Sequence, residues 1–92
     1  MFDYSKLPEH MQDGMRLYIE LGIEGGSFLM AVLCNDLMGA AGKADHINRE
    51  CLLDFCNFLY NEAPTGCHGS RGKVEAWILR GGLRGNKEEE AA

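Results

Sequence analysis

The sequence predicts an all-α fold, a compact four-helix single domain over residues 1–85 with a glycine-rich loop between helices 3 and 4. Three observations predict this fold. Apolar residues recur at steps of three and four along four segments, which is the period of an amphipathic helix. The alternation of apolar and polar residues that is typical of strands is absent. Glycine or proline follows the end of every segment, where helices stop.

The first expected helix runs from about Pro8 to Leu21. Proline suits the first turn of a helix, because the N–H that it lacks has no partner there. Gly22 is the expected stop after the last turn. The apolar positions at helical spacing are Met11, Met15, Tyr18 and Ile19.

The second expected helix opens at Gly25-Gly26-Ser27 and ends near Ala41, with Gly42 as its stop. Asn35 and Asp36 interrupt its otherwise apolar middle. The wide apolar face predicts burial against the rest of the domain. That face is formed by Phe28, Leu29, Val32, Leu33 and Leu37.

The third expected helix begins after Asp45, a plausible N-cap residue, and ends at Ala63-Pro64. It ends there because a residue before proline is pushed out of the α region. A long apolar stripe predicts that this helix is the central one. The stripe contains Ile47, Cys51, Leu52, Phe55, Cys56, Phe58 and Leu59.

The fourth expected helix is short, begins at the N-cap residue Ser70 and stops at Gly81-Gly82. Beyond it, residues 86–92 carry Lys87 and three glutamates, and their composition predicts a disordered acidic tail.

Charge is unevenly distributed along the chain, whose net charge is −5. Residues 1–64 carry four Lys/Arg and ten Asp/Glu, whereas residues 65–85 have a net charge of +3. An acidic protein lacks the basic footprint that bulk nucleic-acid binding requires. The local basic region can still hold a phosphate or an acidic surface.

The chain shows no secretory leader pattern and no apolar run of about 20 residues that could span a bilayer. Cys34, Cys51 and Cys56 fall on or near apolar helix faces, where a free thiol behaves as a small hydrophobic group. These observations predict a reduced protein of the cytoplasm, without a membrane partner.

The segment from Leu59 to Lys73 is the strongest candidate for a ligand site. Hydroxyl and cationic groups at the start of a helix are suited to phosphate, because the backbone N–H groups there favour anions. Two aromatic residues flank the loop and could stack on a base. The candidate residues are Tyr60, Thr65, Cys67, His68, Ser70, Arg71, Lys73 and Trp77. The alternative is an ordinary capped helix with solvated basic residues.

Two polar pairs, Asn35-Asp36 and Asn61-Glu62, form a second candidate set, because such side chains can match the edge of a base or a ribose. Their alternative role is to satisfy groups within the fold. Ser27 opens another helix start, and two converging helix starts would make a stronger anion site than one.

The spacing of residues argues against several chemistries, and it leaves open a metal site assembled from distant parts of the chain. The loop does not match the nucleotide-hydrolase pattern, since five residues separate Gly66 from Gly72-Lys73 and Val74 follows. No paired cysteines or histidines have zinc-ligand spacing. Adjacent Cys67 and His68 do not make a nucleophile and base pair without a third, orienting group. We therefore expect no metal, no cofactor and no enzymatic activity.

Much of residues 8–83 resembles a group of small proteins encoded by tailed bacteriophages. The resembling segments are His10-Met11, Gly22-Ile23, Gly26–Leu29, Ala31–Leu33, Asn35–Leu37, Leu59–Pro64, Gly66-Cys67, Gly69-Ser70 and Trp77-Ile78. The resemblance implies an accessory, counter-defence role in the bacterial cytoplasm that acts by binding. The thin core of a chain of 92 residues is compatible with a monomer and would be relieved by a homo-oligomer. The sequence thus predicts a protein that binds a small anionic, nucleotide-like ligand. The alternative is an inhibitor that presents its acidic helical face to a host protein.

Overall fold

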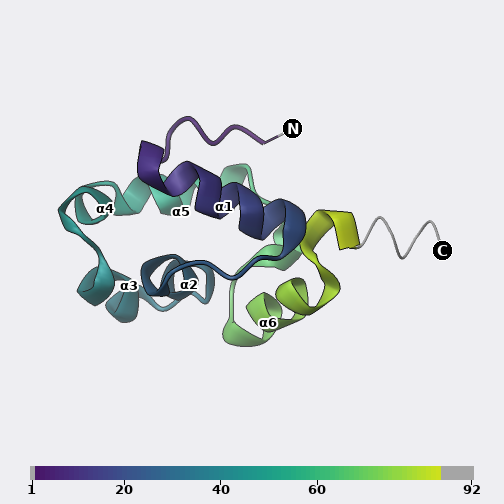
Figure 1. Cartoon of the computed structure of the whole chain (residues 1–92). Helices are drawn as coiled ribbons and strands as arrows, with labels where there is room; N and C mark the ends of the chain where they lie inside the picture. The colour runs from purple at the N-terminus through teal and green to yellow at the C-terminus, as the bar shows by residue number, and fades with distance from the viewer. Residues whose placement is uncertain (1, 86–92) are drawn as a thin grey trace.

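The computed structural model describes residues 2–85, and helices are the regular secondary structure in that range (Figure 1). The all-α prediction is confirmed. The expected count of four is wrong: residues 82–85 are helical, and the elements with defined bounds in the described range are six α-helices and one 3₁₀ helix. They are α1 (Glu9–Leu21), α2 (Ser27–Leu33), α3 (Leu37–Lys43), α4 (His46–Glu50), α5 (Leu52–Asn61), η1 (Thr65–Cys67) and α6 (Arg71–Arg80).

The expected second helix is divided into α2 and α3 at Asn35 and Asp36. Asn35 has a φ of 63°, in the left-handed region that ends a helix. The Asp36 side chain then accepts a hydrogen bond of 2.9 Å from the backbone N–H of Gly39 and caps α3. Asn and Asp compete with helical backbone bonds in this way, which is why they favour helix ends.

The expected third helix is divided into α4 and α5 at Cys51, whose φ of −102° and ψ of 13° lie outside the helical region. Its predicted N-cap is confirmed, since the Asp45 side chain accepts a 2.7 Å hydrogen bond from the backbone N–H of Asn48. The long apolar stripe therefore spans two helices joined by a sharp turn.

The segment between α5 and α6 is not a free glycine-rich loop. It contains η1, and two of its backbone groups are bonded to the core. The carbonyl of Cys67 accepts a 2.7 Å hydrogen bond from the Tyr18 hydroxyl, and the N–H of Gly69 donates to the Leu33 carbonyl at 2.8 Å. These bonds attach the segment to α1 and to the end of α2.

The core is centred on Tyr18 of α1 and Phe55 of α5, both fully buried. Phe55 also meets Phe28 of α2 edge to face, with ring centroids 5.2 Å apart. Such a contact adds a favourable ring geometry to the burial of apolar area. In Figure 1, α1 lies in front of α5, and α2 and α6 lie below these two helices.

The end of α1 touches the segment that follows α6 (Figure 1). Gly22 and Gly82 both have a φ of +70°. A Cβ atom added at Gly22 would lie 2.7 Å from the Gly82 nitrogen, so neither position has room for a side chain. The predicted helix-stopping glycines thus also allow two backbones to meet.

No helix among residues 2–85 has the length and apolar character needed to cross a membrane. The predicted acidic tail at residues 86–92 lies outside the described residues.

Candidate functional site

Three of the predicted site residues line one pocket between α2, α3 and α6, which we call the α2–α6 pocket. Ser27, Asp36 and Arg71 come from three separate parts of the chain and face a volume of about 320 Å³. That volume is at the lower end of the range for small-molecule sites. Ser27 and Arg71 are the first residues of α2 and α6, so the two expected helix starts do border one space.

Lys43, at the end of α3, also lines the α2–α6 pocket. Neither Lys43 nor Arg71 makes an ion pair within 4.0 Å of a carboxylate among residues 2–85. Three carboxylates, those of Glu24, Asp36 and Glu75, line the same pocket. The two cations of the pocket can therefore bind an anionic group of a ligand. Its carboxylates can accept hydrogen bonds from donor groups of the same ligand.

Ser70 is the N-cap of α6, as predicted: its hydroxyl accepts a 3.2 Å hydrogen bond from the backbone N–H of Lys73. Its oxygen is thus engaged within the helix start. The Lys73 side chain does not line the α2–α6 pocket and lies beside His68 and Gly69. Burial lowers the pKa of His68, and the charge of Lys73 acts in the same direction.

Cys67 and Trp77 belong to the core. The Trp77 ring is 3% exposed, and its indole N–H donates a 3.0 Å hydrogen bond to the Tyr18 carbonyl. Arg80 covers the ring at 4.8 Å from its centroid. The stacking role expected for Trp77 therefore does not fit its position, and Cys67 is likewise closed to a ligand because its side chain is fully buried.

The remaining candidate residues lie apart from the α2–α6 pocket. Tyr60 is 88% exposed on α5, and Thr65 is exposed in η1. Asn61 and Glu62 line another pocket, of about 390 Å³, beside Asp54. Asn35 lines a small apolar one of about 50 Å³. The thirteen predicted residues are thus distributed over several surfaces rather than gathered in one site.

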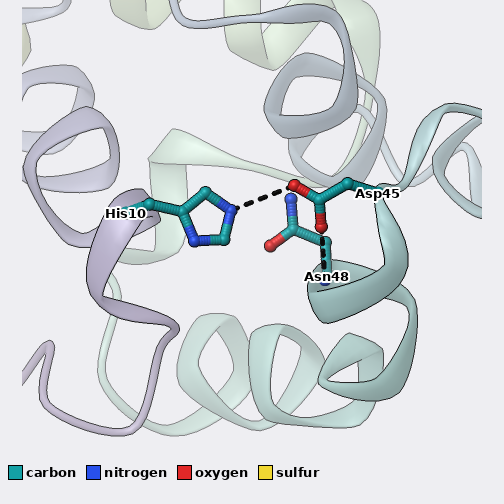
Figure 2. A network of polar contacts seen from close by, with 3 residues as sticks. All are labelled: His10, Asp45 and Asn48. Atoms are coloured by element: carbon teal, nitrogen blue, oxygen red, sulfur yellow. Dashed lines mark hydrogen bonds and ion pairs between the residues drawn. The ribbon is translucent and has the colours of Figure 1, made fainter.

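A second polar pocket, which sequence analysis missed, lies between α1 and α4, and we call it the α1–α4 pocket. It has a volume of about 380 Å³ and is lined by His10, Asp45 and Asn48, among others. Figure 2 shows how these three side chains converge: His10 Nε2 is 3.2 Å from Asp45 Oδ2, and Asp45 Oδ1 accepts from the Asn48 backbone. That backbone N–H holds the pKa of Asp45 below its ordinary value, burial opposes it, and His10 adds to the lowering.

The sequence contains a signal that could have identified Asn48. The positions Ala44, Asn48, Cys51 and Phe55 follow the helical period, and all four are buried or half-buried. Asn48 is therefore a polar residue in an apolar stripe. Such an exception is more informative than an exposed polar residue, because a buried amide requires partners.

Residues 2–85 hold no group of three or more His, Cys, Asp or Glu side chains arranged to bind a metal ion. Cys34, Cys51, Cys56 and Cys67 are free thiols. Burial raises the pKa of the Cys67 thiol to about 12, so its reactive thiolate is disfavoured in the folded protein.

Comparison of the chain with protein-family models, with curated proteins and with solved structures found no match.

Proposed function

We propose that this protein binds a small phosphorylated, nucleotide-like ligand in the α2–α6 pocket, as a binding protein and not as an enzyme. The observation that supports this most directly is the pair of cations, Arg71 and Lys43, that faces one pocket without an ion-pair partner among residues 2–85. A phosphate group would bridge the two and complete their pairing.

The position of Arg71 adds to the attraction. It is the first residue of α6, a helix of ten residues whose first turn leaves backbone N–H groups without helical partners. Ser70 engages one of these groups. The positive end of the helix dipole therefore lies where the phosphate would bind.

The carboxylates of Glu24 and Glu75 restrict the class of ligand. Phosphate groups alone would engage only the two cations, whereas the hydroxyls of a sugar could also donate hydrogen bonds to these carboxylates. A sugar phosphate or nucleotide fits this mixture of charges. With the resemblance to bacteriophage accessory proteins, we propose capture of a signalling nucleotide in the bacterial cytoplasm.

Calorimetric titration of the protein with pyrophosphate tests this proposal. We expect saturable binding that falls at least tenfold in Arg71→Glu and in Lys43→Glu, with the melting temperature nearly unchanged. Arg49→Glu is the matched control, because Arg49 is exposed and lines neither pocket. Binding that is equal in all four proteins would refute the site.

A second candidate function is inhibition of a host protein through α5. Leu53 and Tyr60 are 77% and 88% exposed, and with exposed Cys56 they share one face of that helix. Asp54 and Glu62, from the same part of the chain, line a separate pocket, so a partner that covers both surfaces would need an apolar region and a basic region.

A pulldown from host lysate with the wild-type protein as bait tests this second candidate, which predicts that one host protein is retained. The partner should be lost in the double variant Leu53→Ser/Tyr60→Ser and kept in Leu79→Ser, which alters another exposed leucine, on α6. Retention of nothing specific would exclude the candidate.

A further inference from the structure

The side of α5 that points away from the core is apolar and exposed. Leu53, Cys56 and Tyr60 follow one another at steps of three and four residues, so they form one stripe along the helix. Leu53 is 77% exposed and Tyr60 is 88% exposed, and Cys56 is exposed as well. Large apolar side chains in water forgo the free energy that burial would provide. The stripe is therefore available to a partner.

A small apolar groove lies beside the stripe. It has a volume of about 50 Å³ and is formed where α5 meets α2 and α3. Its apolar lining consists of Val32, Leu37, Ala40, Leu52 and Cys56. Cys56 belongs to both the groove and the stripe, so the two are continuous. Leu37, which is 62% exposed, extends the apolar surface onto α3. We call the stripe and the groove together the α3–α5 face.

The size of the α3–α5 face matches the centre of a protein interface. An aromatic side chain alone can bury about 150–250 Å². With Tyr60, Leu53, Leu37 and Cys56 the exposed apolar area reaches several hundred square ångströms, the range in which a patch marks an interaction site. A stable dimer buries about 800 Å² on each partner. The face can supply the apolar centre of such an interface, and the residues around it can supply the rim.

The charge of the chain favours a second copy as the occupant. With 14 Asp/Glu and 9 Lys/Arg, two copies repel one another over much of their surface. The α3–α5 face is an exception, because positions 53, 56, 57 and 60 of α5 are uncharged and Asp54 lines a separate pocket. At the groove, Asp36 uses one oxygen to cap α3. A basic partner would be attracted to the acidic surfaces, whereas a second copy is repelled least at this face.

The shape of the face allows it to pair with itself. A two-fold dimer uses the same patch on both copies, so the patch must contain both a projection and a hollow. The side chains of Leu53 and Tyr60 project, and the groove beside Cys56 is the hollow. When two α5 helices pack antiparallel, Leu53 of one copy lies near Tyr60 of the other. The midpoint between these positions is next to Cys56, so the two Cys56 thiols lie near the two-fold axis.

We infer that the α3–α5 face is the two-fold interface between two copies of this chain, with α5 packed antiparallel against α5 of the second copy. Arg71 and Lys43 do not line the groove, so each copy in the dimer keeps the α2–α6 pocket. The second candidate function assigns the same stripe to a host protein. The two occupants exclude each other, and the experiment distinguishes them.

Analytical ultracentrifugation of the full chain over a range of concentrations provides the first test. The wild type should sediment with twice the mass of one chain. Leu53→Glu and Tyr60→Glu should each weaken the dimer at least about a hundredfold, because each places two like charges in an apolar interface. Leu79→Glu is the matched control, since Leu79 is 89% exposed on α6 and should leave the dimer unchanged. Circular dichroism verifies that all three variants are folded.

A short bismaleimide provides the second test, because it joins thiols that lie close together. It should link two chains in the wild type and in Leu79→Glu, and should fail to link them in Cys56→Ser and in Leu53→Glu. A monomer at every concentration overturns the inference, and a host protein retained by the α5 stripe would then support the second candidate function. A dimer that persists in Leu53→Glu and Tyr60→Glu, or a cross-link that persists in Cys56→Ser, would place the interface elsewhere and also overturn the inference.

Discussion

The hydroxyl of Tyr18 donates a hydrogen bond of 2.7 Å to the backbone carbonyl of Cys67, 49 residues further along the chain. The carbonyl of the same tyrosine accepts the indole N–H of Trp77. One residue of α1 therefore holds both η1 and α6 in place. Since Arg71 opens α6, the position of a proposed phosphate-binding residue depends on a contact in the core.

Replacing Tyr18 with phenylalanine should destabilise the protein by about 1–3 kcal/mol, because the change leaves a buried carbonyl without its donor. Urea unfolding followed by fluorescence measures this, since Trp77 is the single tryptophan and is buried. Tyr60→Phe removes the same hydroxyl from an exposed ring and should change stability by less than about 0.5 kcal/mol. Equal effects of the two variants would contradict the role assigned to Tyr18.

Stability should fall in alkaline solution because of Cys67. Burial raises the pKa of its thiol from 9.0 to about 12. Between these values the unfolded chain loses a proton that the folded protein retains, so the free energy of unfolding decreases as pH rises. The contribution is complete below pH 9.0 and is lost as the pH approaches 12.

The measurement is the urea midpoint as a function of pH for Cys67→Ala and for Cys56→Ala. The first variant should flatten the alkaline decrease, whereas the second should keep it, because Cys56 is exposed. An alkaline decrease of the same slope in both variants would show that Cys67 is not its source.

Gly22→Ala should destabilise the protein by more than about 2 kcal/mol. The left-handed backbone alone costs an alanine about 1–2 kcal/mol, and the new methyl group would lie against the Gly82 backbone. Gly42→Ala has open space around it within α3 and should stabilise by up to about 1 kcal/mol through helix propensity. Thermal unfolding of both variants checks this, and a neutral Gly22→Ala would refute the close approach of the two backbones.

The class of fold and the helix ends could be predicted because they depend on local chemistry. Ser70 and Asp45 cap helices as expected, and Gly22 and Gly81 end them in the left-handed region. The predicted number of helices was wrong because the preference of Asn35 and Asp36 for helix ends outweighed the continuous apolar periodicity around them. The sequence shows the periodicity, but it does not show which of the two effects is stronger.

The candidate site was harder to predict, because it depends on which segments meet. Arg71 and Ser27 were identified from helix starts, and they do line one pocket. No local sequence motif marks Lys43 as a site residue. It lines the pocket because the turn between α2 and α3 brings the end of α3 there. Trp77 was misjudged as a stacking residue because its sequence position beside the loop does not reveal the Tyr18 carbonyl that binds its indole N–H.

The most direct test of the proposed site is a nuclear magnetic resonance titration of the isotope-labelled protein with pyrophosphate. The account predicts saturable shifts in the backbone amide signals of Ser27, Lys43 and Arg71, which come from three helices that border one pocket. The signals of Tyr60 and Asn61 should stay in place, since these residues lie on another surface. Shifts confined to residues 59–69, or no shifts at all, would contradict the account.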